Sequence, residues 1–282
     1  MIPANVRGED RDHFMEILSR ITEKIAPEKI ICFGSRTMYR ESWNNFLPQG
    51  IAHAYTYYDL LVITKKEDKR KDREIFQVID MFNSGLHINA VSHNITYVNK
   101  AILKGHRFFV TICKKGVVMY ESTNIPLAIP GPELGEKKYA RRAVKSWERL
   151  FNLAKQYYRI ARKYTGSDSN EVSALMYHQA VEFACRAMIK YHTGYRPVTH
   201  DIERLVSLLG NFTREKIDKF SHLDEYSHIQ VLFNAYRVVR LREDCKVYHT
   251  ELSTIELRVG QFIALIERLY GVHRRSLQNS TD

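Results

Sequence analysis

The chain has 282 residues, of which 44% are hydrophobic, 27% charged and 11% aromatic. This length and apolar content predict two folded domains and exclude a disordered, collagen-like or low-complexity chain. No apolar run approaches the roughly 20 residues of a membrane helix, and the N-terminus has no apolar signal-peptide core, so we expect a soluble cytoplasmic protein with no membrane partner. The formal net charge of +11 favours phosphate-rich partners, but ordinary surface charge explains it equally well.

The first 130 residues or so alternate between helical and extended patterns. Alternation of this kind predicts an α/β domain built around a mixed sheet. The predicted elements, in chain order, are a helix at 12–26, strands at 29–33 and 57–64, a helix at 74–82, and extended segments at 88–92, 108–113 and 117–120.

Three prolines in the eight residues 125–132 predict a boundary, since proline cannot donate a hydrogen bond to a β-ladder and restricts the residue before it. We place one domain at 1–128, a linker at 129–135, an all-α antiparallel bundle at 136–275 and a frayed tail at 276–282. The fold class is therefore α+β, a mixed-sheet domain followed by a helical bundle. Helical spacing predicts five bundle segments, at 138–163, 171–191, 201–209, 229–241 and 251–269.

The first strand runs into Gly34 and Ser35, where backbone N–H groups and a hydroxyl could bind a phosphate, although a plain turn has the same sequence. On the next strand, Asp59 stands directly before an apolar run. Phe33-Gly34-Ser35-Arg36 and Asp59-Leu60-Leu61-Val62 together resemble the nucleotidyltransferase superfamily, in its minimal branch. The resemblance implies nucleotide binding by Gly34, Ser35, Arg36 and Asp59, with Asp59 also a metal ligand.

One position departs from that family. Its members hold Mg²⁺ with two carboxylates separated by one residue, and here Tyr57 stands where the first carboxylate belongs. On the strand expected to carry a third carboxylate, the nearest polar residues are His87 and Asn89. The resemblance allows Mg²⁺ and a nucleoside triphosphate as cofactors. We expect loss of transferase activity, unless His87, Asn89 or other residues supply unusual ligands.

The segment 36–57 is expected to be a long loop between the two strands. Its aromatic side chains could stack on a nucleotide base, or they could pack the loop onto the domain. These aromatic residues are Tyr39, Trp43, Phe46, Tyr55 and Tyr57.

A second group of polar residues lies in the helical half. His178 and Glu182 stand at i, i+4 on one helix face, with Gln179 on the adjacent face. A short loop later, Thr199 is a candidate N-cap and His200 lies at the start of the next helix. Taken alone, these residues are explained by a helix-surface hydrogen bond and a helix cap.

The His-Gln-Ala-x-Glu helix followed by Thr-His-Asp resembles the HEPN domain over roughly residues 138–269. This helical bundle occurs beside nucleotidyltransferases and in prokaryotic toxins and defence proteins. The resemblance assigns His178, Gln179, Glu182 and His200 to the HEPN motif. It also implies a homodimer formed through the bundle.

Many HEPN proteins are metal-independent ribonucleases that use an arginine and a histidine a few residues apart. Arg242 and His249 have six residues between them, which fits the family spacing. Ala235-Tyr236 ahead of Arg240 suggests instead that Arg240 is the family arginine, and eight residues then separate it from His249. Arg240, Arg242 and His249 are the catalytic candidates, and Arg240 is also a candidate for an internal ion pair or a phosphate contact.

The order of the two domains resembles bacterial nucleotidyltransferase–HEPN fusions. Three functions remain open. The chain could be a nucleotide- or RNA-interacting protein of toxin–antitoxin or phage-defence type with a degenerate transferase site. It could be an active nucleotidyltransferase acting on protein, RNA or a small molecule, or a HEPN ribonuclease.

Overall fold

The structure is a computed structural model, and the chain divides into two compact units, Met1–Leu134 and Gly135–Asp282. The division falls at the end of the expected linker. None of the described helices is long and apolar enough to cross a membrane. The structure describes residues 8–44, 47–70, 72–82, 86–122, 125–131, 136–166, 170–213, 231–233, 235–236, 239 and 247–279.

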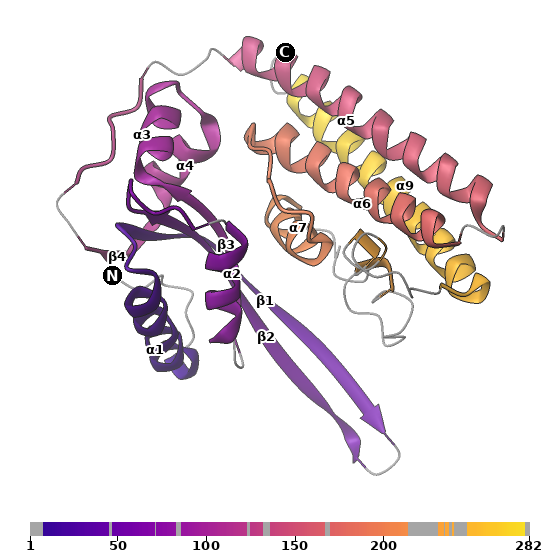
Figure 1. The fold of residues 1–282 in the computed structure, drawn as a ribbon, viewed down its shortest axis with the longest axis horizontal. Helices are drawn as coiled ribbons and strands as arrows, with labels where there is room; N and C mark the ends of the chain where they lie inside the picture. The colour runs from indigo at the N-terminus through magenta and orange to yellow at the C-terminus, as the bar shows by residue number, and fades with distance from the viewer. Residues whose placement is uncertain are drawn as a thin grey trace. The chain divides into compact units, whose positions relative to one another are not determined.

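The first unit contains a four-stranded mixed sheet in the order β3-β2-β1-β4 (Figure 1). β1 pairs antiparallel with both β2 and β4, and β2 pairs parallel with β3. The expected mixed-sheet α/β unit is therefore confirmed. Its elements are α1 (Gly8–Ile25), β1 (Lys29–Asn44), β2 (Leu47–Thr64), α2 (Asp72–Met81), β3 (His87–Asn94), α3 (Ile95–Leu103), α4 (Arg107–Lys115) and β4 (Val117–Glu121).

The core of this unit lies between one face of the sheet and helices α1 and α2. The 3.6-residue spacing of apolar residues in α1 turns Phe14 and Ile21 toward the strands, and both are fully buried. Phe14 stacks on Tyr58, with ring centroids 4.2 Å apart. Side chains alternate along a strand, so Tyr58, Leu60 and Val62 of β2 point into this core, and Asp59 projects from the opposite face of the sheet.

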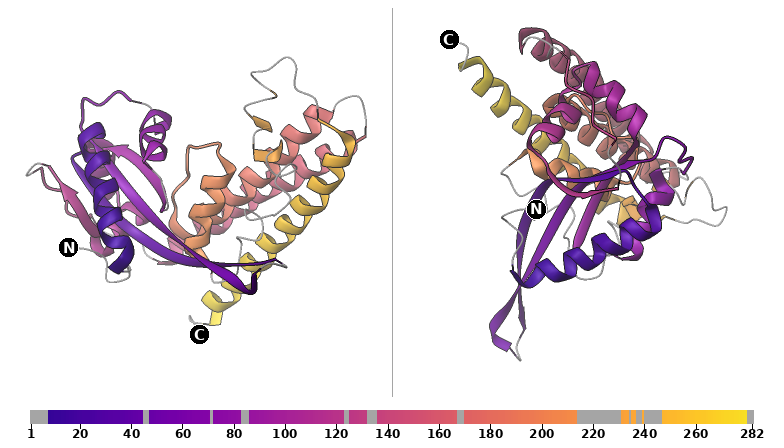
Figure 2. Two further views of the ribbon diagram at one scale, coloured as in Figure 1. Left: turned by 90° about the horizontal axis from the view of Figure 1, so that it is seen from below. Right: turned by 90° about the vertical axis from the view of Figure 1, so that its left-hand side faces the viewer.

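The prediction of a turn at Gly34-Ser35, followed by a loop over 36–57, is wrong. β1 continues through Gly34 and Ser35 to Asn44, and β2 returns from Leu47, so most of 36–57 is a long β-hairpin (Figures 1 and 2). β4 pairs with β1 over Lys29–Cys32, and β3 pairs with β2 over Tyr57–Thr64. The rest of the hairpin extends beyond this four-stranded part of the sheet. Its many aromatic and β-branched residues favour strand, and cross-strand pairing gives every second backbone group a partner.

The extended segment expected at 108–113 is also wrong, because it is helical and belongs to α4. A short apolar run fits a buried strand or a buried helix equally well from periodicity alone. Here Phe108, Phe109 and Ile112 are buried on one side, and the helix ends at Lys115, with Gly116 as its C-cap. A Cβ at Gly116 would lie 2.5 Å from the Ile112 carbonyl oxygen, so this close approach requires glycine.

The second unit is a bundle of helices α5, α6 and α9, which lie side by side in Figures 1 and 2. The Tyr139 hydroxyl, near the start of α5, donates to the Tyr191 carbonyl near the end of α6. α5 and α6 are therefore antiparallel, as expected. The described elements are α5 (Glu136–Tyr164), α6 (Asn170–Thr193), α7 (Ile202–Leu209), the 3₁₀ turn η1 (Gly210–Phe212) and α9 (His249–Asn279), with further helical residues at 231–233, 235–236 and 239.

Aromatic stacking holds α5 to α9. The Trp147 ring stacks on Tyr270 at 4.1 Å and on Phe151 at 4.5 Å between ring centroids. Trp147 is 4% exposed, which makes it one of the largest contributors to the core of the bundle. α9 continues to Asn279, so residues 276–279 are helical and the expected frayed tail is wrong over that part.

Candidate functional site

In the first unit, Asp59 lies in a row of three residues across the sheet. A bulge in β1, between Cys32 and Gly34, shifts the register so that Gly34 pairs with Asp59, and Asp59 pairs in turn with Asn89. Asn89 Nδ2 donates to Asp59 Oδ1 at 2.9 Å. Asp59 is 0% exposed and Asn89 is 7% exposed, so this carboxylate is held inside the sheet by an amide.

The neighbouring row on the same face is aromatic and cationic. Arg36, Tyr57 and His87 pair across β1, β2 and β3. The Tyr57 and His87 rings stack with centroids 4.6 Å apart and planes 17° apart, and the Arg36 guanidinium carbon lies 4.8 Å from the Tyr57 centroid. All three side chains are half-buried. We call Arg36, Tyr57 and His87 the aromatic row.

The structure places Ser35 and Asp59, both expected to bind the nucleotide, on opposite faces of the sheet. Ser35 pairs with Tyr58, whereas Gly34 pairs with Asp59 and Arg36 with Tyr57. Because neighbouring strand residues project to opposite faces, the Ser35 side chain lies on the Tyr58 face, away from Asp59. Of the expected nucleotide-binding residues, Gly34, Arg36 and Asp59 therefore share one face, and Ser35 does not.

The surroundings of Asp59 do not fit a two-metal centre. Metal ions in such centres are bridged by paired carboxylates, and the position two residues before Asp59 is Tyr57, stacked on His87. Asn89 presents its NH₂ group to the carboxylate, and that group donates hydrogen bonds and does not bind Mg²⁺. Among the described residues, no three His, Cys, Asp or Glu side chains are grouped to hold a metal ion.

The thiol of Cys32 lies beside this site. Its Sγ donates to the Gly34 carbonyl at 3.5 Å. Burial raises the pKa of Cys32 to about 11, and the negative charge of Asp59 raises it further. Burial therefore disfavours the thiolate, which is the form in which a cysteine acts as a nucleophile.

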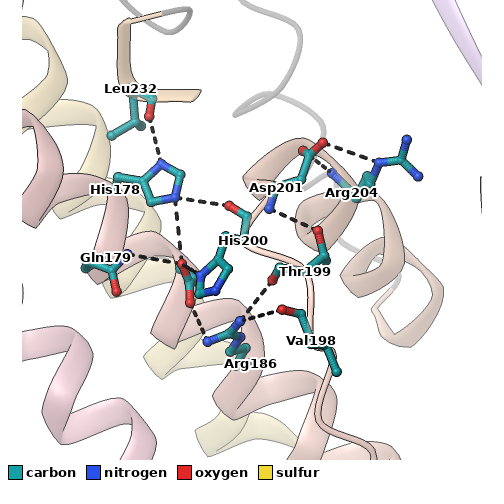
Figure 3. Close-up of polar contacts among 10 residues, drawn as sticks. His178, Gln179, Arg186, Val198, Thr199, His200, Asp201, Arg204 and Leu232 are labelled. Carbon is teal, nitrogen blue, oxygen red and sulfur yellow. Dashed lines mark hydrogen bonds and ion pairs between the residues drawn. The ribbon is translucent and has the colours of Figure 1, made fainter. Parts of the chain in front are cut away.

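In the second unit, the motif residues lie around one buried carboxylate, that of Glu182 on α6. Figure 3 labels its neighbours His178, Gln179, Arg186 and His200. Glu182 is 0% exposed. Its Oε2 accepts from His200 Nδ1 at 3.0 Å and from Gln179 Nε2 at 3.1 Å, and it lies 3.7 Å from His178 Nε2. Its Oε1 forms an ion pair with Arg186. We call these five residues the Glu182 cluster.

Arg186 links α6 to the segment that follows it. Residues 178, 182 and 186 are four apart, so they lie on one helix face. Arg186 Nη2 donates to the carbonyls of Val198 and Thr199 at 3.2 and 2.9 Å. Burial lowers the pKa of Arg186, and the nearby Glu182 carboxylate opposes that effect. The guanidinium therefore compensates the buried charge and holds the returning chain.

The two ring nitrogens of His178 face two backbone carbonyls. Nδ1 lies 2.9 Å from the Leu232 oxygen, and Nε2 lies 3.1 Å from the His200 oxygen. A neutral imidazole has one N–H and can donate to one of them, whereas the protonated ring can donate to both. Burial lowers the pKa of His178, although both carbonyls and Glu182 oppose this. The ring is thus fixed between two segments of backbone.

His200 is the accessible member of the cluster, with 44% of its side chain exposed. Its ring stacks on Tyr236 with centroids 4.3 Å apart and planes 9° apart, and Tyr236 also stacks on His178 at 5.5 Å. The expected N-cap at Thr199 is wrong. Asp201 caps α7 by accepting from the Arg204 backbone N–H, and Thr199 Oγ1 accepts from the Asp201 backbone N–H.

The structure brings His178, Gln179, Glu182 and His200 together, as the motif suggested. Arg240 and Arg242 lie outside the described residues, so their pairing with His249 stays a prediction. His249 is the exposed first residue of α9. Arg186 was not predicted from the sequence, and Tyr236 was recognised only as a neighbour of Arg240, not as a contact of His178 and His200. The i, i+4 spacing from Glu182 was a signal for Arg186, and the aromatic side chain after Ala235 was a weaker one for Tyr236.

Comparison with known proteins bears on the second unit. Residues 147–247 match the HEPN domain family. One solved structure, a nucleotidyltransferase-like protein from Exiguobacterium sibiricum, aligns with 93% of this chain and 80% of its own, at 13% sequence identity and a TM-score of 0.26. No curated protein matches the chain. The family match covers α6, α7 and the Glu182 cluster, and the second unit of this chain therefore contains a HEPN domain.

Proposed function

We propose that the chain is a nucleotide- or RNA-interacting protein of toxin–antitoxin or phage-defence type, whose first unit binds a nucleotide without transferring it. The observation that carries the proposal is the pair of rows on one sheet face. Asp59 is fully buried and bonded to Asn89. Beside it, where a second carboxylate would stand, the half-buried Tyr57 ring stacks on His87 under the Arg36 guanidinium.

The aromatic row has the chemistry of a nucleotide-binding surface. An aromatic ring can stack on a base, and base–aromatic stacking contributes about 1–3 kcal/mol per base. Arginine binds phosphate through its planar set of donors. The chain's net charge of +11 adds a general attraction for phosphates. No step of transfer chemistry is assigned, because the Asp59 surroundings do not fit the metal pair that such chemistry uses.

We further propose that the Glu182 cluster is a structural centre of the HEPN domain. It links α6 to the segments around Val198, His200 and Leu232. A homodimer formed through this bundle is part of the same proposal, and light scattering of the purified chain measures it directly. A monomer at all concentrations would remove the dimer from the proposal.

The transferase question is tested with ATP and the other nucleoside triphosphates, each labelled at the α-phosphate, incubated with the full chain, RNA and Mg²⁺. We expect no label on the chain or on RNA, and binding of the nucleotide by equilibrium titration. Arg36→Gln should weaken that binding about tenfold or more, since it removes a charged contact. Arg11→Gln, an exposed arginine on α1, is the matched control. Transfer that is lost in Asp59→Ala would overturn the proposal.

A further inference from the structure

The N-terminal half of α5 carries four cations on its solvent side. Lys138, Arg142, Lys145 and Arg149 follow each other at i, i+4, i+7 and i+11, and all four are exposed. This spacing places them on one helix face. Residues on the opposite face, such as Trp147, are buried against the bundle. At a rise of about 1.5 Å per residue, these cations recur about every 5–6 Å along the helix.

Two more cations lie near Arg149. They are Lys190, near the end of α6, and Arg196, in the segment that follows α6. The bond from the Tyr139 hydroxyl to the Tyr191 carbonyl places the start of α5 along the end of α6. Burial lowers the pKa of Lys190, and the positive charges of Arg149 and Arg196 lower it further. Lys190 therefore lies close enough to both arginines to be affected by their charge.

Among the residues that the structure describes, these six cations lack the ion-pair partners that two other basic residues of α5 have. Further along the same helix, Lys155 pairs with Glu267 at 3.2 Å and Arg162 pairs with Glu256 at 2.8 Å. In the described part of the chain, none of the six forms a hydrogen bond or an ion pair with another residue. We call this set the cationic face: Lys138, Arg142, Lys145, Arg149, Lys190 and Arg196.

We propose that the cationic face binds the phosphate backbone of RNA. A row of exposed cations that repel one another gains free energy when phosphates replace their counterions. The face has no exposed large apolar residue between Lys138 and Arg149; those of α5 are Ile160 and Tyr164, at the other end. A helix that lies on a membrane needs such residues beside its cations. The polar face therefore suits a nucleic-acid backbone.

This inference rests on the proposed function for its ligand, RNA, but it uses a different surface from the aromatic row. Arg142, Lys145 and Arg149 lie exposed on the solvent side of α5, so they can be neutralised without disturbing the core. For single strands, each phosphate contact contributes about 0.7 to the slope of log affinity against log salt concentration. Three lost contacts should therefore reduce that slope by about 2.

The test uses the full chain and a labelled single-stranded RNA of mixed sequence, titrated at salt concentrations from about 50 to about 200 mM. The triple variant Arg142→Gln, Lys145→Gln and Arg149→Gln should bind the RNA at least about tenfold more weakly and show the reduced slope. The control triple variant removes the same charge from the same helix: Lys155→Gln, Arg159→Gln and Arg162→Gln. It should keep nearly the affinity and slope of the natural chain.

Equal losses in the two triple variants would overturn the inference, because net charge alone would then explain binding. Unchanged RNA affinity in the first triple variant would overturn it as well. It would also be overturned if the chain bound anionic phospholipid vesicles and that binding fell equally when the same three cations were removed. ATP titration separates this result from the proposed function. If the natural chain binds ATP and Arg36→Gln does not, the proposed function stands whatever the RNA result. If ATP does not bind but RNA binding needs the cationic face, only the nucleotide part of that function fails.

Discussion

Asp59 in the first unit and Glu182 in the second are both fully buried carboxylates, but their surroundings differ. Glu182 contacts a guanidinium, two imidazoles and an amide, contributed by α6 and the segment after it. Asp59 accepts from the amide of Asn89 on the adjacent strand. The first arrangement connects separate segments of backbone, and the second lies within a single sheet.

The neighbours of the two carboxylates also differ in exposure. Around Glu182, His178 and Arg186 are almost completely buried, and His200 alone of the five cluster residues is exposed. Beside Asp59, the aromatic row is half-buried and carries an arginine. A buried carboxylate therefore does not by itself mark a catalytic site. The residues beside it decide whether a ligand can reach it.

Removal of the Glu182 carboxylate should have the largest effect on the stability of the second unit. Glu182→Ala leaves the Arg186 guanidinium buried without its partner, and breaking a buried ion pair in this way costs about 3–5 kcal/mol. We expect a loss of that size in the free energy of unfolding of the second unit, measured by urea denaturation. Glu267→Gln, which removes an exposed pair with Lys155, is the control and should cost less than about 1 kcal/mol.

A double variant shows whether the lost stability comes from the unpaired charge of Arg186. Glu182→Leu combined with Arg186→Met removes both charges and keeps similar volume, which is often close to neutral. It should recover much of the stability lost in Glu182→Ala. A single variant that loses less than about 1 kcal/mol would contradict a structural role for the Glu182 cluster.

The pH dependence of stability tests burial in the first unit. Burial lowers the pKa of His93 to about 4 from 6.5, with the charge of His106 adding to the effect. Because the unfolded chain then binds the proton more readily, stability should fall as pH drops from about 6.5 to about 4, by about 3 kcal/mol for this group. The loss is complete below the folded pKa. His93→Phe should flatten the pH profile over that range, and an unchanged profile would contradict the assignment.

Loss of the hydrogen bond from Asn89 to Asp59 should have a smaller effect on stability. Asn89→Ala removes the donor to Asp59 Oδ1 within the sheet, which costs about 1–3 kcal/mol when the acceptor stays buried. Chemical denaturation of the full chain measures this loss for the first unit. Ser122→Ala, which removes a longer hydrogen bond of 3.3 Å to Glu28 from an exposed residue, is the control and should change stability little. Equal effects in the two variants would show that the Asp59 site is not specially dependent on Asn89.

The sequence predicted the fold where periodicity was strong. The 3.6-residue spacing of α1, α5, α6 and α9 placed the helices, and the strand at 57–64, which carries Asp59, was recognised from its β-branched and aromatic residues. It failed at Gly34-Ser35, since a glycine and a serine suit both a turn and a bulged strand, and pairing with a distant segment decides between them. It failed at 108–113 because this segment, apolar except for Thr111, is too short for its period to be read.

The candidate sites were predictable to different degrees. Local spacing was enough to group His178, Gln179 and Glu182, because all three lie within two turns of one helix. The bonds from Arg186 to Val198 and Thr199 depend on where the chain returns after α6, and no local pattern encodes that. Likewise, Tyr57 was recognised as a missing carboxylate, but its stack on His87 follows from the parallel pairing of β2 with β3.

Binding of a nucleotide at the aromatic row without a metal pair can be measured as the affinity of the full chain for ATP, by calorimetry with Mg²⁺ and again with EDTA. We expect nearly the same Kd in both, and a Kd raised about tenfold, or about 1.4 kcal/mol, by Tyr57→Ala. A Kd that worsens about tenfold or more on removal of Mg²⁺, and does not change in Tyr57→Ala, would contradict it.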